Sequence, residues 1–253
     1  MEDPEPARDP GASADAASGR LVASPFLREV PPEELEAVLL QHRLWLSSGG
    51  LDGACANLDR TSLNGACLQG ADLQRAELRS ASLQRAELRL ATLNRALLEG
   101  ANLHQASLSR AALRGADLRR ANLIGAQLRQ VDLQQADLRG ADLRGADLLE
   151  ADLRGADLTG VLAVGANLFM ANLDQATLAE AVLRQADLQG GLLRGADLRL
   201  AHLQDVRLAG ADLTGARLEG ADLLDAEGLT RQQVRSAVID GRTRLPGYLR
   251  PQG

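Results

Sequence analysis

The sequence predicts an all-β solenoid assembled from five-residue units, and three observations support this fold class. Leu stands at residue 58 and at every fifth position to Leu223, giving 34 consecutive units in which only Ala163 breaks the column. Ala precedes this position by two residues in 29 of the 34 units. The residue between them is Asp or Asn in 17 units. Self-similarity at a fixed period is the signature of a repeat architecture.

The five-residue period excludes both regular elements. On an α-helix a five-residue step advances about 140° net, so the Leu side chains would scatter around the axis. On a straight strand the same step would place alternate Leu side chains on opposite faces. An extended triplet followed by a corner lets Ala and Leu share an inner face while the polar residue points away. Gly closes many units, which suits a corner that needs unusual dihedral angles.

The most regular stretch runs from Val131 to Gly160 and reads VDLQQ ADLRG ADLRG ADLLE ADLRG ADLTG. This pattern resembles the pentapeptide-repeat protein family, whose consensus is close to A-[D/N]-L-x-x, over about residues 56–225. The resemblance implies a right-handed quadrilateral β-helix in which four units complete one coil. The 34 units would then make about 8.5 coils. At roughly 4.8 Å between coils, the rod would be about 40 Å long.

Four segments are expected along the chain. Residues 1–24 are rich in Pro, Ala, Ser and Asp, which predicts a disordered N-terminal segment. Residues 25–50 would form an N-terminal capping helix, residues 51–225 the β-helix, and residues 226–253 a C-terminal capping helix and tail. Caps are expected because the ends of a β-helix expose unpaired backbone groups.

Both capping helices have sequence signatures. The first would run from Pro31 or Pro32 to about Ser47, with acidic residues in its first turn. The side chains expected to cover the first coil are Leu35, Val38, Leu39 and Leu46, with Val30 and Trp45 nearby. Thr230 and Gln233 make a capping-box signature for a helix that extends to about Ile239. The tail after it is predicted to be an extended cap or a dimer arm, and the resemblance makes a homodimer possible.

Composition and motifs predict that the protein is not an enzyme. All 28 basic residues are Arg, which excludes a P-loop lysine and a lysine Schiff base. His42, His104 and His202 are expected to be ordinary surface residues with no shared metal or acid–base geometry. Cys55 and Cys67 form neither a metal motif nor a disulfide framework. We therefore expect no catalytic residue, no metal and no cofactor.

Location and partner class follow from what the sequence lacks. No window of about 20 apolar residues is present, so no membrane partner is expected. The opening residues MEDPEPARDP lack the basic and apolar regions of a secretory signal, which predicts a cytoplasmic protein. The net charge of −6 argues against direct nucleic-acid binding, which needs a basic surface.

Charge is unevenly distributed along the repeats. Residues 56–130 hold 11 Arg and 6 acidic residues, whereas residues 131–225 hold 8 Arg and 16 acidic residues. The acidic half opens with one aspartate in each of six successive units, and these form the candidate acidic surface: Asp132, Asp137, Asp142, Asp147, Asp152 and Asp157. Two interpretations stand: the aspartates hold the corners by bonding nearby backbone and pair with Arg, or a partner recognises them.

A second candidate surface is apolar. Outward positions around the unit VLAVG at residues 161–165 carry the candidate interaction patch: Leu149, Leu162, Val164, Phe169, Met170 and Val182. With 20 residues per coil, Leu149 would stack on Phe169 and Leu162 on Val182. Exposed apolar patches often mark interaction surfaces. The alternative is a local irregularity in which Val161 fills lumen space left by Ala163.

Together these features favour a non-enzymatic protein-interaction or scaffold module that presents the outer faces of a rigid rod to a protein partner. The resemblance implies a sharper alternative. Some pentapeptide-repeat proteins mimic duplex DNA, bind DNA gyrase or topoisomerase IV, and protect these enzymes from quinolone-type inhibitors. The acidic C-terminal half fits a DNA mimic, whereas the Arg-rich N-terminal half and the uninterrupted repeats depart from it.

Overall fold

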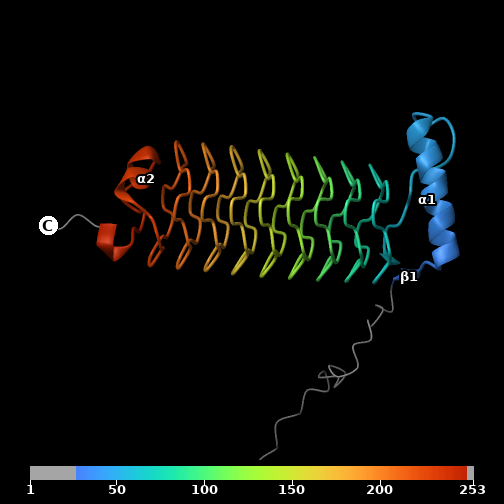
Figure 1. The fold of residues 1–253 in the computed structure, drawn as a ribbon, viewed down its shortest axis with the longest axis horizontal. Coiled ribbons are helices and arrows are strands. Elements are labelled where there is room, and N and C mark those ends of the chain that lie inside the picture. The colour runs from blue at the N-terminus through green and yellow to red at the C-terminus, as the bar shows by residue number, and fades with distance from the viewer. Residues whose placement is uncertain (1–26, 250–253) are drawn as a thin grey trace, which may run out of the picture.

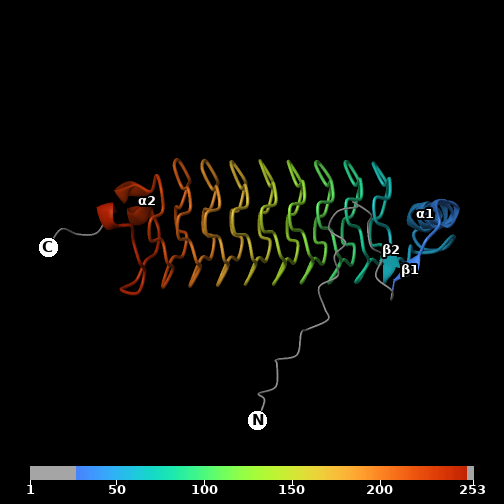
Figure 2. The same cartoon turned by 90° about the horizontal axis from the view of Figure 1, so that it is seen from below.

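The computed structural model describes residues 27–249 as an elongated rod with a cap at each end (Figure 1). In chain order the elements are β1 (Arg28–Glu29), α1 (Pro32–Ser47), β2 (Thr61–Ser62), α2 (Arg231–Ser236) and the 3-10 helix η1 (Gly247–Leu249). Between β2 and α2 the backbone forms a stack of similar coils, which the perpendicular view also shows (Figure 2). The predicted all-β solenoid with helical caps is therefore confirmed, while the predicted disorder of residues 1–24 lies outside the described residues.

Each coil takes 20 residues and has four faces. The middle residue of each triplet forms a parallel bridge with the residue 20 positions later, beginning with Asn57 and Glu77. The ladder continues to residue 227. We number the faces by their middle residues: face 1 holds residues 57, 77 and 97 onward, face 2 holds 62, 82 and 102, face 3 holds 67, 87 and 107, and face 4 holds 72, 92 and 112.

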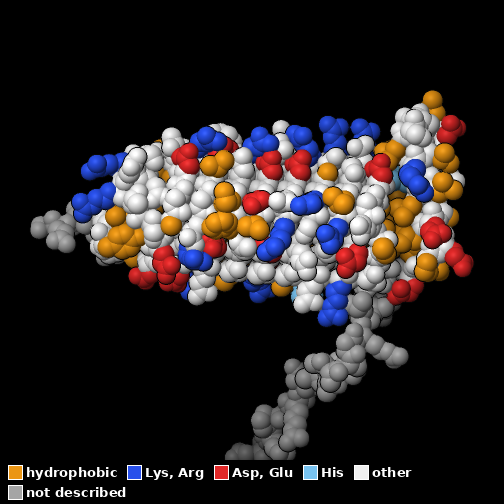
Figure 3. All heavy atoms as spheres, viewed as in Figure 1, with side chains coloured by type: hydrophobic (Ala, Val, Ile, Leu, Met, Phe, Trp, Pro, Cys, Tyr) orange, Lys and Arg blue, Asp and Glu red, His pale blue; other side chains and the backbone are white. Residues whose placement is uncertain are grey.

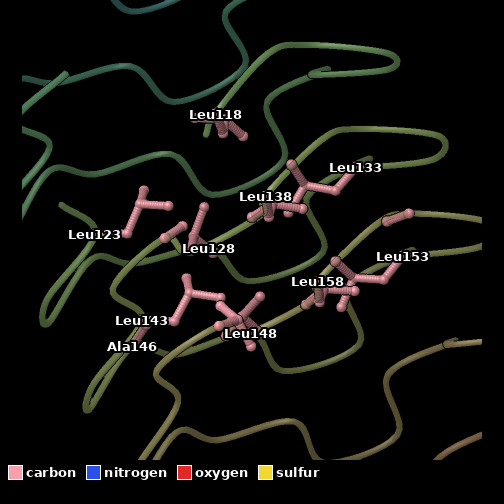
Figure 4. Packing of buried hydrophobic residues seen from close by; sticks show 14 of the residues in the cluster. Leu118, Leu123, Leu128, Leu133, Leu138, Leu143, Ala146, Leu148, Leu153 and Leu158 are labelled. Carbon is pink, nitrogen blue, oxygen red and sulfur yellow. The ribbon is translucent and has the colours of Figure 1, made fainter. Parts of the chain in front are cut away.

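The lumen is filled by the repeated Leu and Ala side chains. Every Leu of the five-residue column is at most 3% exposed. Figure 4 shows the leucines of successive coils converging inside the rod. Burying one such side chain contributes roughly 1.5–3 kcal/mol. Val161 and Ala163 are both buried, so Val161 occupies the lumen of the unit that lacks Leu.

The corners use left-handed backbone in every unit. The last residue of each unit, from Arg60 to Asp225, has a φ between +52° and +71°. Gly fills 15 of these 34 corners and other residues fill 19. A non-Gly residue in this region costs roughly 1–2 kcal/mol. The fold therefore imposes the corner even where the sequence does not supply Gly.

The N-terminal cap covers the first coil as predicted. Leu35 is buried, and Val30, Val38 and Leu39 pack against the same core, whereas the predicted Leu46 and Trp45 are half-buried and do not belong to this group. The sequence had not indicated β1, whose two residues pair in parallel with β2. The cap therefore adds both an apolar cover and a short backbone pairing to the exposed end of the ladder.

The prediction that His42 is a surface residue is wrong. His42 is fully buried, and its Nδ1 accepts a hydrogen bond of 3.0 Å from the backbone N–H of Ala56. Its ring stacks on Trp45 at 5.7 Å between ring centroids. The physical reason is that Ala56 begins the first unit. In later units this N–H donates to the carbonyl of the Leu three residues earlier, as Ala66 does to Leu63, whereas Ala56 has no preceding unit and His42 takes the place of that acceptor. Burial lowers the pKa of His42 below its ordinary value, against the opposing effect of Asp72.

The C-terminal helix is shorter than predicted. Thr230 and Gln233 form the expected capping box, but α2 stops before the predicted end at about Ile239. The chain instead resumes the ladder, where Val238 pairs in parallel with Arg217. This pairing satisfies backbone groups of the last coils that a longer helix would leave without partners.

The described part of the tail folds back over the rod. Val234 and Ala237 pack against the core, and Arg244 pairs in parallel with Asp222. The hydroxyl of Tyr248 donates a hydrogen bond of 2.8 Å to the carbonyl of Ala226. Of the two alternatives for this tail, the structure favours a cap through residue 249.

Acidification is expected to loosen the N-terminal cap through His42. In the folded protein His42 binds a proton less readily than in the unfolded chain. Its contribution to stability is therefore present above its ordinary pKa of 6.5 and is lost as the pH falls below that value. Trp45 is the only Trp, so its fluorescence reports on this contact. We expect a fluorescence transition below pH 6.5 that is absent in His42→Gln; the same transition in both proteins would contradict the assignment.

Candidate functional site

The outer surface is where any functional site of the rod must lie, because side chains fill the lumen. Among residues 27–249, no group of three or more His, Cys, Asp or Glu side chains could hold a metal ion. In the same part of the chain, no helix is long and apolar enough to cross a membrane. The hollows on this surface include one of about 600 Å³ between α1 and the first coil and one of about 350 Å³ along a corner of the N-terminal half.

The six aspartates of the candidate acidic surface hold the corners of the coils. The side chain of each accepts a hydrogen bond from the backbone N–H two residues later. For example, Arg139 N–H donates to Asp137 Oδ1 at 3.2 Å. This is the local side-chain-to-backbone bond that Asp readily makes beside a turn. The aspartates therefore have a structural role that accounts for their repetition.

Each of these aspartates also lies within 4.0 Å of an arginine. The pairs are Arg114–Asp132, Arg139–Asp137, Arg144–Asp142, Arg129–Asp147, Arg154–Asp152 and Arg139–Asp157, at 3.8, 2.6, 2.6, 2.5, 2.6 and 3.7 Å. Hydrogen bonds from the Arg139 guanidinium lower the pKa of Asp137 below its ordinary value. The candidate acidic surface is thus largely neutralised by its own neighbours, which favours the first of the two interpretations.

The two halves of the rod differ in how their arginines are paired. Among residues 27–249, seven of the eight arginines in 131–225 lie within 4.0 Å of a carboxylate, Arg184 being the exception. In 56–130 only five of the eleven do. The six without a described carboxylate partner are Arg60, Arg75, Arg85, Arg89, Arg95 and Arg110. The N-terminal half therefore presents unneutralised positive charge.

The candidate interaction patch lies on four columns of outward residues. Leu162 and Val182 pair directly on face 2, as predicted. Phe169 accepts the ladder hydrogen bond from Glu150 N–H at 3.0 Å, which places Leu149 and Phe169 on successive coils of one corner. Leu162, Phe169 and Met170 are 39%, 37% and 54% exposed, whereas the other three side chains are half-buried.

These columns do not form one continuous apolar patch. Val164 lies at the corner between faces 2 and 3, whereas Phe169 and Met170 lie at the corner between faces 3 and 4. Face 3 separates them with polar residues, where the Asn167 amide donates a hydrogen bond of 2.9 Å to Asp147. In Figure 3 the hydrophobic side chains of the viewed face likewise gather in separate groups among charged ones. The apolar residues thus border a flat polar face.

Two relevant features were missed from the sequence. His42 follows Leu35 by seven residues, so it falls on the same side of α1, and this spacing was the available signal. The hollow lined by Arg75, Arg95 and Arg114 had only a regional indication in the sequence, namely the excess of Arg in residues 56–130. Its position depends on which side chains meet on successive coils.

The sequence profile of pentapeptide repeats matches eight copies in this chain, over residues 56–95, 96–135, 121–160, 164–199 and 201–227. The chain therefore belongs to the pentapeptide-repeat family. No curated protein sequence matches it significantly.

Solved structures with a similar fold include HetL, a pentapeptide-repeat protein involved in heterocyst differentiation regulation in the cyanobacterium Nostoc. Its match has 32% identity and a TM-score of 0.39 and covers 81% of this chain and 97% of HetL. A second is QnrB1, a plasmid-mediated fluoroquinolone resistance protein, with 18% identity, a TM-score of 0.45 and coverage of 77% and 91%. A third, from the Arabidopsis thaliana thylakoid lumen, has 27% identity, a TM-score of 0.23 and coverage of 47% and 72%.

The corner role of the aspartates is testable at Asp137. Asp137→Ala removes both the turn hydrogen bond and the ion pair, so we expect the free energy of unfolding to fall by about 1 kcal/mol. Asp137→Asn keeps an acceptor for the backbone N–H and loses only an exposed ion pair, which is worth less than about 0.5 kcal/mol in most proteins. Urea unfolding measures both values.

Glu180→Ala is the matched control, because Glu180 is an exposed corner residue whose side chain makes no hydrogen bond or ion pair with the described residues. Its stability should stay within about 0.5 kcal/mol of the wild type. Equal losses in Asp137→Ala and Asp137→Asn would contradict the corner role.

Proposed function

We propose that the protein is a non-enzymatic interaction scaffold that binds a protein partner on face 3 of the rod. The observation that carries this proposal is the exposure of Phe169 and Met170 beside that face and of Leu162 on the adjoining face 2. None of the three is needed to fill the lumen. Each Å² of apolar area that a partner removes from water stabilises the complex by about 25 cal/mol. Exposed apolar side chains therefore favour binding where a partner covers them.

The surroundings of face 3 suit a flat protein surface. Phe169 and Met170 border one side and Val164 the other, while Asp147 and Asn167 between them offer polar groups. Phe169 is one of only two Phe in the chain. Aromatic side chains contribute heavily to the centres of protein interfaces, so Phe169 is the proposed anchor.

The DNA-mimic alternative receives less support. Duplex DNA carries one negative charge per about 1.7 Å of helix axis. In this protein the six successive aspartates lie beside arginines, and six arginines of the other half have no carboxylate partner among residues 27–249. The similarity to QnrB1, at 18% identity, concerns the fold alone. We therefore favour a partner that contacts apolar side chains over one that recognises an anionic rod.

Phe169→Asp tests the proposed anchor. Truncation of an interface anchor costs more than about 2 kcal/mol, so partner capture from the native host should fall more than about tenfold. The captured proteins are quantified by mass spectrometry, and light scattering measures oligomeric mass to reveal a second copy as the partner. The rod should remain folded, because Phe169 is 37% exposed and lies outside the lumen.

Leu90→Asp is the matched control. Leu90 is 57% exposed and occupies the same corner column as Met170, four coils earlier. This variant tests whether an exposed apolar residue at any corner contributes to partner capture through nonspecific hydrophobic contact. Unchanged capture and unchanged mass in Phe169→Asp, or equal losses in both variants, would overturn the proposed surface.

A further inference from the structure

An arginine-lined hollow follows the corner between faces 4 and 1 across four successive coils. It has a volume of about 350 Å³ and is lined by Gln74, Arg75, Asn94, Arg95, Arg114, Gly115 and Gln135. None of the described residues that line it carries a carboxylate. Among residues 27–249, Arg75 and Arg95 have no carboxylate within 4.0 Å, and Arg114 has only Asp132, at 3.8 Å. We name this feature the arginine hollow.

The polar groups of the arginine hollow are mostly hydrogen-bond donors. Three guanidinium groups line it, and the side-chain oxygen of Asn94 already accepts from Arg114 N–H at 2.8 Å. This leaves the Asn94 amide group as a donor. Guanidinium groups bind carboxylates and phosphates through paired N–H donors, so the hollow fits an anionic ligand.

The charge pattern of the rod favours a short anionic ligand over a long one. The basic half spans residues 56–130, which is less than four coils or roughly 18 Å at the spacing of paired strands. A duplex nucleic acid lying along the rod would continue over the acidic half, where residues 131–225 have twice as many acidic residues as Arg, 16 against 8. A short carboxylate-rich polypeptide would be held within the basic half.

The chain itself contains such a segment. Residues 2–15 hold Glu2, Asp3, Glu5, Asp9 and Asp15 with one Arg, a net charge of −4. The segment precedes β1, where Arg28 N–H donates a hydrogen bond of 3.0 Å to the carbonyl of Arg60. Arg60 closes a unit at one edge of face 1, and the arginine hollow lies at the other edge of that face.

The length of the connection allows contact. Twelve residues join position 15 to position 27, and a fully extended chain of that length spans at most about 40 Å. The hollow lies within roughly 15 Å of the first coil along the rod. Tethering would raise the effective concentration of the segment to the millimolar range, which offsets the weakness of individual exposed ion pairs.

We propose that the arginine hollow binds the acidic N-terminal segment, residues 2–15, of the same chain. Bound there, the segment neutralises Arg75 and Arg95, which have no carboxylate within 4.0 Å among residues 27–249, and covers part of the basic half. An acidic partner of this half would have to displace it. The proposal does not depend on the apolar surface beside face 3, because the two lie on different faces and in different halves of the rod.

Paramagnetic relaxation of the full-length protein tests this contact. Cys55→Ser and Cys67→Ser provide a cysteine-free background, and a nitroxide is attached at Gln135→Cys on the rim of the hollow. The matched label is at Gln105→Cys, which is also an exposed Gln at a left-handed corner, with φ of 55° against 57° for Gln135. Gln105 lies at the diagonally opposite corner, one and a half coils nearer to the N-terminal end.

We expect the Gln135 label to broaden the amide signals of residues 2–15 more than the Gln105 label does. The excess should fall at least about threefold at 0.5 M salt, where the Debye length shrinks to about 4 Å. The excess should fall similarly in the triple variant that combines Arg75→Gln, Arg95→Gln and Arg114→Gln. The excess should persist in the control triple variant that combines Arg184→Gln, Arg231→Gln and Arg235→Gln. This control removes the same amount of positive charge, from three arginines without a described carboxylate partner.

Equal broadening from the two labels would overturn the proposal. So would an excess that is unchanged by salt and by loss of the three arginines of the hollow. Neither outcome bears on partner capture through Phe169, so failure here is distinguishable from failure of the proposed function.

Discussion

The stacking of one Leu from every unit inside the lumen is the interaction on which the rest of the structure depends. Each fully buried Leu contributes roughly 1.5–3 kcal/mol. Left-handed corners at non-Gly residues cost roughly 1–2 kcal/mol each, and 19 of the 34 corners carry that cost. Lumen packing is the larger effect, so the five-residue period is maintained even at corners occupied by Arg, Gln or Leu.

The lumen also explains why the outer surface can vary. Ala and Leu fix the cross-section, and the ladder fixes which outward residues become neighbours at intervals of 20. Arginines and aspartates can therefore change from coil to coil without altering the fold. This freedom allows one half of the rod to carry paired charges and the other half to carry six arginines without a described carboxylate partner.

Features set by the repeat were predictable from the sequence, whereas features set by contacts between distant segments were not. The Leu column predicted the coils, and Pro32 with the acidic first turn predicted α1. The two residues of β1 pair only because the first coil has a free edge. His42 is buried because it accepts the N–H of Ala56, which has no preceding unit to bond, and α2 ends early because the chain returns to the ladder at Val238. The acidic surface was recognisable in the sequence, but its neutralisation by Arg depends on side-chain geometry.

The unit at residues 161–165 offers the most direct test of lumen packing, because it alone replaces Leu by Ala and also carries Val where Ala is usual. Val161 and Ala163 are both buried, so their volumes should compensate. The measurement is a double-mutant cycle of urea unfolding with Val161→Ala, Ala163→Leu and the double variant. Each single change should cost about 1–3 kcal/mol, through a cavity or overpacking, and the double variant should lie within about 1 kcal/mol of the wild type. Additive losses in the double variant would contradict the account.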